Sequence, residues 1–265
     1  MAIDLAPTPP GAEAPAALRP ILTPGLVIVP TYNECENIPL LLPRVLAYPE
    51  LSVLVVDDGS PDGTGDLVAA EVEHNPRVHL IRRGGKQGLG TAYVAGFRYA
   101  LARGAEYIFE MDADFSHNPE DLERLYEACA EQGADVAIGS RYINGITVIN
   151  WPIGRVIMSY YASTYVRTVL GMDIRDTTAG FKCYKRKVLE TINLDKIKFM
   201  GYAFQVEMKY NAWKHGFKLV EVPIIFTDRK EGVSKMSPKI FKEAFLGVIQ
   251  MRFKSFFRKY KKVGQ

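Results

Sequence analysis

Short β-branched apolar runs alternate with stretches of helical spacing along most of this chain, and this alternation restricts the fold strongly. Apolar residues recur at three- and four-residue intervals over residues 91–102 and 120–131, which predicts helices there. The apolar runs occupy residues 26–29, 52–56, 78–81, 107–111 and 136–138. Buried strands separated by helices predict an α/β fold with a mostly parallel sheet that is covered on both faces.

The second half of the chain is less regular and contains no internal repeat. Its predicted helices cover about residues 154–170, 203–215 and 238–260, and its predicted strands lie at residues 181–184 and 219–225. A chain of 265 residues fits one large domain with a helical appendage. We therefore expect a catalytic domain at residues 25–235 and a basic amphipathic helix at residues 236–265.

Composition excludes several classes of protein. Hydrophobic residues make up 48% and charged residues 24%, so neither overall disorder nor an integral membrane protein is indicated. The net charge of +3 does not indicate a nucleic-acid partner. Residues 1–24 are rich in Ala and Pro, which predicts a disordered tail.

The cysteines and the absence of long apolar stretches predict where the protein works. Cys35, Cys129 and Cys183 are odd in number and lack CxxC spacing, which indicates a reducing compartment rather than a disulfide framework or a zinc site. No stretch approaches the roughly 20 apolar residues of a spanning helix, and the N-terminus lacks the pattern of a secretion signal. We expect a cytoplasmic protein whose contact with a membrane is peripheral.

Carboxylate-bearing segments directly follow three of the predicted strands, at residues 30–34, 57–60 and 112–114. The carboxyl ends of parallel strands meet at one edge of a sheet, where ligands bind. Asp112 and Asp114 are two residues apart in an extended segment, so their carboxylates project the same way and can share one hard cation. The alternative interpretation is a solvated turn.

Asp57 and Asp58 also follow a buried strand, where adjacent carboxylates favour a ligand such as ribose or a base. In the alternative, Asp57 accepts hydrogen bonds from the turn and Asp58 alone contacts the ligand. The glycine-rich segment 84–90 is not a P-loop, because neither Ser nor Thr follows Lys86. Lys86 could contact a phosphate or solvent.

Several basic residues occupy positions that suit phosphate binding. Arg141 directly follows the strand predicted at residues 136–138, and Arg155 begins a predicted helix with Ser159 one turn later. Residues four apart share a helix face, and a helix N-terminus favours anions, so Arg155 and Ser159 can hold one phosphate. Arg229 and Lys235 lie in a Gly-containing loop with similar potential. His117 is interpreted as a packing or loop-bonding residue.

Six motifs occur in order over about residues 26–240. They are PTYNE at 30–34, DDGSPDGT at 57–64, GLGTAY at 88–93, DADFSHNP at 112–119, GSRY at 139–142 and DRKEGVSK at 228–235. Together they resemble the dolichol- or polyprenol-phosphate mannosyltransferases of glycosyltransferase family 2, although each motif alone is unspecific. The resemblance implies a glycosyltransferase A-type fold, in which a Rossmann-like sheet carries a metal-binding DxD motif.

The resemblance also implies roles for individual residues. The nucleotide would be held by Pro30, Tyr32, Glu34, Val56 and Asp58. The diphosphate and a Mg²⁺ or Mn²⁺ ion would face Asp112, Ala113 and Asp114, and the lipid phosphate would contact Arg141, Arg155 and Ser159. Arg229 and Lys235 would form an active-site loop that contacts the nucleotide sugar, and the catalytic set would be Asp114, Arg141, Arg155 and Arg229. Ser116 departs from the family, since some members carry Gln there, and its role stays open.

The implied reaction is inverting transfer of mannose from GDP-mannose to a dolichyl or polyprenyl phosphate, giving a β-linked product. A phosphate monoester with a second pKa of about 6 is largely dianionic at pH 7, so it needs arginines to hold it rather than a general base. One alternative is a polyprenyl-phosphate glucosyltransferase that uses UDP-glucose, a group that usually carries spanning C-terminal helices. The other is a non-catalytic sugar-nucleotide-binding subunit, which would not require both a metal pair and a second set of arginines.

The C-terminal helix carries an aromatic stripe beside basic residues. The stripe comprises Leu246, Ile249, Phe253, Phe256, Phe257 and Tyr260, and the basic residues are Lys254, Arg258, Lys261 and Lys262. This pattern is typical of a helix that lies in a membrane interface. In the alternative, the stripe packs on the catalytic domain. We predict peripheral contact with the cytoplasmic face of a membrane, which a small anchoring subunit could assist.

Overall fold

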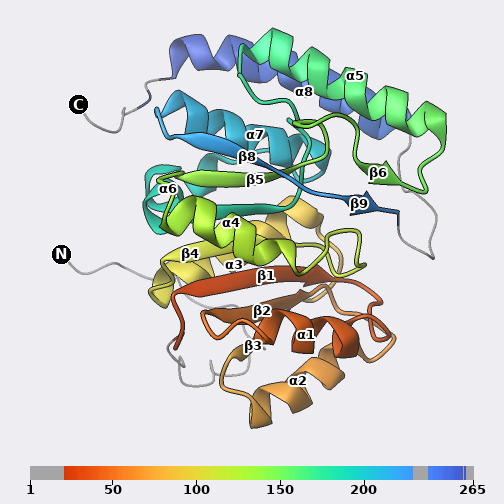
Figure 1. Ribbon diagram of the computed structural model, residues 1–265, viewed down its shortest axis with the longest axis vertical. Coiled ribbons are helices and arrows are strands. Elements are labelled where there is room, and N and C mark those ends of the chain that lie inside the picture. Colours follow the sequence, from red (N-terminus) through yellow and green to blue (C-terminus); the bar gives the residue numbers. More distant parts are fainter. Residues whose placement is uncertain (1–20, 229–237, 259, 261–265) are drawn as a thin grey trace.

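The computed structural model describes residues 21–228, 238–258 and 260 and contains a seven-stranded sheet with the order β3-β2-β1-β4-β7-β5-β8 (Figure 1). The strands are β1 (Gly25–Thr31), β2 (Leu51–Asp57), β3 (Val78–Arg82), β4 (Tyr107–Glu110), β5 (Val136–Ser140), β7 (Lys182–Lys185) and β8 (Leu219–Pro223). All neighbouring pairs are parallel except those of β7, which is antiparallel to β4 and β5. The predicted mostly parallel sheet is confirmed, and every predicted apolar run overlaps a strand.

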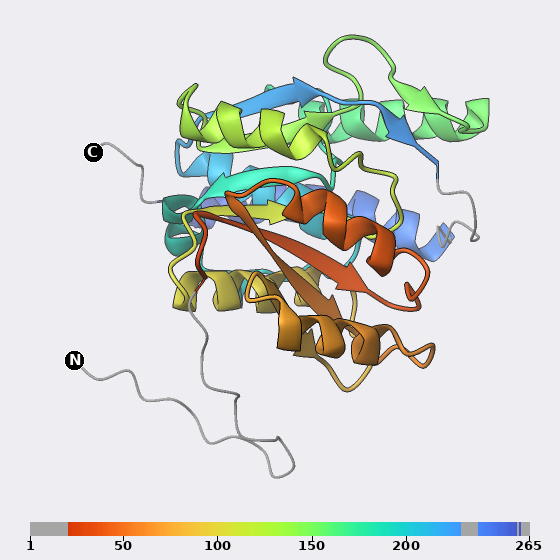
Figure 2. The same cartoon turned by 60° about the horizontal axis from the view of Figure 1, so that its bottom comes forward.

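Helices cover both faces of this sheet (Figures 1 and 2). They are α1 (Ile38–Leu46), α2 (Thr64–His74), α3 (Leu89–Ala102), α4 (Asp121–Ala130), α5 (Ile153–Leu170), α6 (Arg186–Thr191), α7 (Tyr202–Lys214) and α8 (Pro238–Phe257). Alternation along the strands explains the two faces: in β1, Leu26 and Ile28 join the core of α3 and α7, whereas Val27 and Val29 join the core of α1, α2 and α4. A two-stranded sheet of β6 (Val148–Ile149) and β9 (Phe226–Thr227) lies beside α5.

Helices α5 and α8 lie side by side in an outer layer, and α8 also packs on α7 (Figure 1). Tyr165 of α5 stacks on Phe245 of α8 with ring centroids 4.4 Å apart, and its hydroxyl donates to the carbonyl of Phe245 (3.1 Å). Within the described residues, no helix is both long enough and apolar enough to cross a membrane.

The chain enters the sheet just before β1. Thr23 lies 2.8 Å from Ser52 between hydroxyl oxygens, and the carbonyl of Pro24 accepts a hydrogen bond from the N–H of Tyr107 (3.0 Å). The prediction of a disordered tail over residues 1–24 is therefore wrong for Thr23 and Pro24, which are hydrogen-bonded to the sheet. Residues 1–20 of that predicted tail lie outside the described residues. The predicted domain boundaries stay predictions.

The antiparallel direction of β7 has a consequence for the site. The other central strands end at one edge of the sheet, but β7 begins there. Residues 176–180, which precede β7, therefore lie beside the segments that follow β4 and β5. This edge carries the polar loops that the sequence singled out.

Candidate active site

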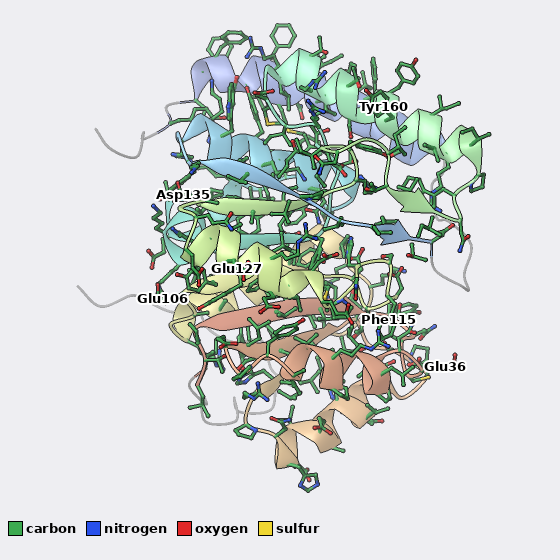
Figure 3. All side chains as sticks on the ribbon, viewed as in Figure 1. Glu36, Glu106, Phe115, Glu127, Asp135 and Tyr160 are labelled. Atoms are coloured by element: carbon green, nitrogen blue, oxygen red, sulfur yellow. The ribbon has the colours of Figure 1, made fainter. Side chains whose placement is uncertain are left out.

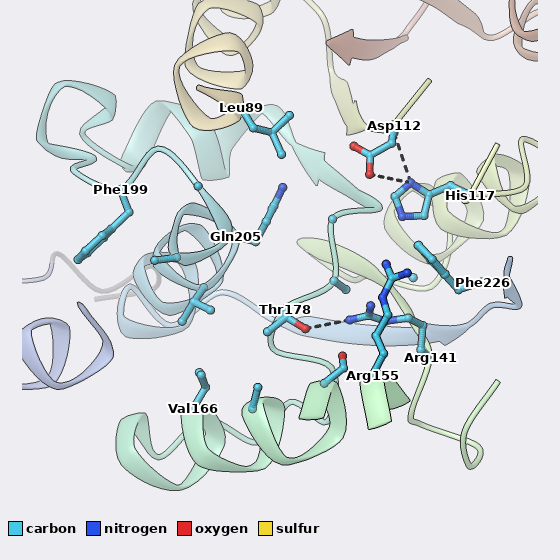
Figure 4. A pocket seen from close by; sticks show the side chains of 18 of the residues that line it. Leu89, Asp112, His117, Arg141, Arg155, Val166, Thr178, Phe199, Gln205 and Phe226 are labelled. Carbon is cyan, nitrogen blue, oxygen red and sulfur yellow. Dashed lines mark hydrogen bonds and ion pairs between the residues drawn. The ribbon is translucent and has the colours of Figure 1, made fainter. Parts of the chain in front are cut away.

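A cavity of about 1170 Å³ opens at this edge of the sheet and continues to α5 and α8. One end carries charged side chains, among them Glu34, Asp112, Asp114, Arg141 and Arg155. The other end is apolar and is lined by Leu89, Tyr165, Val166, Phe199, Phe245 and Val248. Figure 4 shows the two ends, with Asp112 and Arg141 on one side and Leu89, Val166 and Phe199 on the other.

Asp112 and Asp114 follow β4 and line the charged end. The Asp112 carboxylate accepts a hydrogen bond from the buried Tyr93 hydroxyl (3.3 Å). Oδ1 of Asp114 accepts two hydrogen bonds from Ser116, from its N–H (3.1 Å) and from its hydroxyl (2.6 Å). Ser116 is buried and orients Asp114, which gives a structural role to the residue at which this chain departs from the family pattern.

His117 lines the same end but is held inside the protein. Its ring stacks on Phe181 with centroids 5.0 Å apart, and Nδ1 accepts a hydrogen bond from the backbone N–H of Asp112 (3.3 Å). Burial disfavours the charged imidazolium and lowers the pKa of His117 to about 4. The interpretation of His117 as a packing and loop-bonding residue is confirmed.

The two aspartates fit a sparse metal site. Within the part of the chain that the structure describes, no group of three or more His, Cys, Asp or Glu side chains could hold a metal. Two carboxylates suit Mg²⁺ or Mn²⁺ if water and diphosphate oxygens supply the other ligands, because these hard cations accept oxygen donors and Mg²⁺ commonly retains water. The donor set is therefore appropriate for a metal that arrives with a nucleotide diphosphate.

The two acidic residues after β2 have different surroundings. Asp57 accepts hydrogen bonds from the Thr31 hydroxyl (3.0 Å) and from the backbone N–H of Ser60 (3.1 Å), so it stabilises the turn. Asp58 forms an ion pair with Arg83, whose Nε lies 2.6 Å from its Oδ1. Arg83 also donates to the Thr91 hydroxyl (2.8 Å), which joins Asp58 to the start of α3.

Arg141 follows β5 and is paired inside the protein. Its Nε and Nη2 donate to the two carboxylate oxygens of Asp176, each at 2.7 Å, and its backbone N–H donates to Asp176 at 3.0 Å. Nη2 also lies 2.8 Å from the Thr178 hydroxyl. Asp176 is fully buried and Arg141 is 8% exposed, so this pair forms a fixed cationic part of the cavity wall.

Arg155 lies in the first turn of α5, over the ring of Trp151 with its guanidinium carbon 4.1 Å from the centroid. Its Nη1 donates to both carboxylate oxygens of Asp228 at 2.9 Å. Ser159, one turn later, accepts a hydrogen bond from the Tyr142 hydroxyl (2.7 Å). Arg155 and Ser159 both line the cavity, as expected for residues on one helix face.

A buried polar network lies beneath the cavity. Gln205 donates to Glu110 (2.8 Å) and accepts from Lys182, and the Tyr184 hydroxyl donates to Glu110 (2.9 Å). Lys209 donates to the carbonyl of Ala179 (2.7 Å). Burial lowers the pKa of both lysines. The network ties β4, β7 and α7 to the segment 176–180.

The structure brings most of the predicted site residues to this cavity. Its lining includes Pro30, Glu34, Asp112, Ala113, Asp114, Arg141, Arg155 and Ser159. The side chain of Val56 is buried in the core, so only its backbone could face a ligand, and Tyr32 lies near the protein surface beneath Lys86 (4.6 Å). Asp58 and Ser116 are buried and are not among the lining residues, and Arg229 and Lys235 lie outside the described residues.

Sequence reasoning missed several lining residues and their partners. Trp151, Thr178, Gly180, Gln205 and Phe226 line the cavity, and Asp176 holds Arg141. In a parallel strand, the residues that follow the apolar run reach the ligand-binding edge of the sheet. For an antiparallel strand the residues before the run reach the same edge, so the polar segment 176–180 was the available signal.

Comparison with solved structures identifies the fold. A mannosyltransferase from Pyrobaculum calidifontis, solved with GDP-Man and Mn²⁺, matches with a TM-score of 0.55 and 18% identity over 91% of this chain and 66% of that chain. Glucosyl-3-phosphoglycerate synthase from Mycobacterium tuberculosis matches with a TM-score of 0.60 and 15% identity over 87% of this chain and 80% of that chain. These likenesses confirm the expected glycosyltransferase A-type fold.

Sequence comparison identifies the family. Polyprenol monophosphomannose synthase of Mycolicibacterium smegmatis is 51% identical over 240 residues, which are 90% of each chain. Undecaprenyl-phosphate mannosyltransferase of Micrococcus luteus is 49% identical over 224 residues, 84% of this chain and 91% of that protein. The profile described as glycosyl transferase family 2 matches residues 26–192. The chain therefore belongs to glycosyltransferase family 2.

Proposed function

We propose that this protein is a polyprenyl-phosphate mannosyltransferase that transfers mannose from GDP-mannose to a polyprenyl or dolichyl phosphate with inversion. One observation carries the proposal: a continuous cavity joins a pair of aspartates and two arginines to an apolar end. Such a cavity suits a hydrophilic donor and a phosphate with a hydrocarbon chain. The names of the two relatives at about half identity support the same reaction.

The donor would occupy the end formed by Asp112 and Asp114. A bound Mg²⁺ or Mn²⁺ ion would neutralise charge on the departing nucleoside diphosphate. Ser116 holds Asp114, and Tyr93 holds Asp112, so both carboxylates are oriented before a ligand arrives. Such preorganisation avoids reorganisation when charge develops on the leaving group.

The acceptor phosphate would lie at Arg155 and Ser159, with Arg141 in the adjacent wall. Since the phosphate is largely dianionic at neutral pH, the residues must hold and aim it rather than remove a proton. Trp151 supports the guanidinium of Arg155, and Asp176 fixes that of Arg141. The hydrocarbon chain would then follow the apolar end between α5 and α8.

Product analysis tests the proposal. The purified protein is incubated with Mg²⁺ or Mn²⁺, a polyprenyl phosphate and radiolabelled GDP-mannose or UDP-glucose, and the lipid is then extracted. We expect mannose in the lipid fraction in a β linkage. Transfer from UDP-glucose alone would identify a glucosyltransferase, an α-linked product would exclude single displacement, and nucleotide binding without transfer would identify a sugar-nucleotide-binding subunit.

We also propose that α5 and α8 together contact a membrane surface. The exposed large apolar side chains on these helices are Ile153, Ile157, Met158, Tyr160, Tyr161, Phe245, Leu246, Phe253, Phe256 and Phe257. Val248, Met251 and Ser255 form the buried side of α8, so Leu246, Phe253, Phe256 and Phe257 of the stripe face outward. The other two members are partly buried: Ile249, and Tyr260, which contacts His215. Figure 3 shows Tyr160 in this outer layer, far from Glu36 beside α1.

Basic residues neighbour this apolar surface. Arg252 lies over the ring of Phe256 with its guanidinium carbon 5.0 Å from the centroid, and Lys254 is exposed on the same helix. Each cation near an anionic bilayer contributes about 1 kcal/mol to binding. The charge therefore favours an anionic lipid surface as the partner.

Liposome co-sedimentation tests this contact. Replacing Phe253, Phe256 and Phe257 with Ser should abolish binding to vesicles of phosphatidylcholine and phosphatidylglycerol. The control is Leu40→Ser, since Leu40 is similarly exposed but lies on α1 at the opposite end of the molecule. If the triple Phe variant bound the vesicles as well as Leu40→Ser does, the three aromatic side chains would not be the membrane contact. If the unmodified chain did not bind vesicles, an anchoring subunit would be indicated.

A further inference from the structure

Phe199 lies at the apolar end of the cavity and is confined by its neighbours. Its backbone N–H and that of Lys198 donate to one carboxylate oxygen of Glu207 on α7, at 3.1 Å and 2.9 Å. On the α3 side, the N–H of Gly90 donates to the carbonyl of Met200 (2.8 Å), and a Cβ added to Gly90 would lie 2.8 Å from the carbonyl oxygen of Phe199. The main chain at Phe199 is therefore fixed by α3 and α7.

The ring of Phe199 lies against α8, where Gly247 leaves room for it. A Cβ added to Gly247 would lie 2.7 Å from Cε1 and 3.0 Å from Cζ of Phe199, so either the ring or the helix would have to move. Helix α8 is held by the stacking of Tyr165 on Phe245, two residues before Gly247, and by the hydrogen bond between them. A larger residue at position 247 would therefore move the Phe199 ring rather than helix α8.

The Phe199 ring borders the cavity on one of its sides. Its main chain is fixed on α3 and α7 and its edge touches α8, whereas its remaining side lines the cavity together with Phe245 and Val248. A larger residue at position 247 would displace the ring into the space of the cavity. The apolar end would become narrower while the charged end, with Asp112 and Arg155, would be unaffected (Figure 4).

We propose that Gly247 and Phe199 determine how much of the acceptor's hydrocarbon chain this cavity accepts. The inference rests on the proposed function, in which an isoprenyl phosphate is the acceptor. The glycine allows the aromatic ring to lie on α8, and the ring forms the wall past which the chain runs. These two residues are specificity determinants for the acceptor chain rather than catalytic residues.

Acceptor selectivity tests the proposal. For Gly247→Ala, kcat/KM is measured with a ten-carbon and with a five-carbon isoprenyl phosphate. We expect the ratio of the two values to fall about tenfold, which corresponds to the loss of contact with roughly two methylene groups. The KM for the nucleotide sugar should not change. A ratio equal to that of the unmodified protein would overturn the proposal.

Two further variants make the test specific. Phe199→Leu combined with Gly247→Ala should restore the ratio of the two kcat/KM values, because the smaller Leu side chain fits beside the Ala methyl group without moving into the cavity. If the ratio stayed low in the double variant, Phe199 would not be involved. Gly154→Ala is the matched control, since a Cβ there would meet nothing within 4 Å, and its ratio should be unchanged. If the unmodified protein uses no isoprenyl phosphate at all, the proposed function fails, whereas an unaltered ratio refutes the inference alone.

Discussion

Replacing Asp176 with Asn removes the charge that balances Arg141 while keeping the size of the side chain. Asp176 is fully buried and accepts three N–H donors from Arg141 at 2.7, 2.7 and 3.0 Å. Removing one member of a buried ion pair typically costs about 3–5 kcal/mol because the other charge stays buried without a counter-ion. Against a usual total stability of about 5–15 kcal/mol, this loss is large. We expect the melting temperature to fall by about 10 °C.

Urea and thermal unfolding followed by circular dichroism measure the effect. The matched control is Asp66→Asn. Asp66 forms an ion pair with Arg82 at the protein surface, where the two side chains are 81% and 50% exposed. The control should lose less than about 1 kcal/mol. If Asp176→Asn unfolds within 1 kcal/mol of the unmodified protein, the assignment of Arg141 and Asp176 as a structural ion pair is incorrect.

The same prediction has a pH dependence. Burial by itself raises the pKa of Asp176, but the charge and hydrogen bonds of Arg141 more than offset it, so the pKa lies below its ordinary value. A carboxyl whose pKa is lowered by folding stabilises the protein above its unfolded pKa of about 3.9, and this contribution is lost as the pH falls through the folded pKa. The difference in the free energy of unfolding between the unmodified protein and Asp176→Asn should therefore shrink below about pH 4.

Three other substitutions test the charged end and the loop after β2. Asp114→Ala should abolish transfer and weaken metal-dependent nucleotide binding measured by calorimetry, and unchanged turnover in Mg²⁺ would show that the metal assignment is wrong. Arg155→Ala should raise the KM of the acceptor far more than that of the donor, and the opposite result would reverse the two phosphate sites. Burial raises the pKa of Asp62, but hydrogen bonds from Thr64 and from the N–H of Cys35 outweigh it and lower the pKa to about 2. Asp62→Ala should therefore cost about 1 kcal/mol in chemical denaturation at pH 7, and this contribution should disappear between about pH 4 and pH 2.

The sheet could be predicted from the sequence because its strands are buried on both faces and read as continuous apolar runs. The direction of β7 could not, since an apolar run has the same appearance in parallel and antiparallel pairing. The segment 59–64, which leads into α2, contains the turn-forming residues Gly, Pro and Asp, and Gly63 has a positive φ of 86°. Helix α1 was not located, and Pro43 within it obscures the helical pattern.

The candidate site was predictable to the level of which loops converge, but not to the level of side-chain partners. The position of Asp112 and Asp114 after a buried strand placed them at the cavity. The partners of Arg141 and Arg155, which are Asp176 and Asp228, are 35 and 73 residues away along the chain. Such pairs depend on the three-dimensional path of the chain, which periodicity does not encode.

The strand order has a consequence for the time course of synthesis. Strand β5 is translated before both of its partners, β7 and β8, so its two edges have no neighbours while the ribosome adds the following residues. The edge of β4 that faces β7 waits in the same way. Unpaired edges of apolar strands are sites of self-association, and pairing across long loops is slow. The N-terminal half, with β1 to β4 paired among themselves, can form first, and the active-site edge is completed only when β7 inserts between strands made earlier.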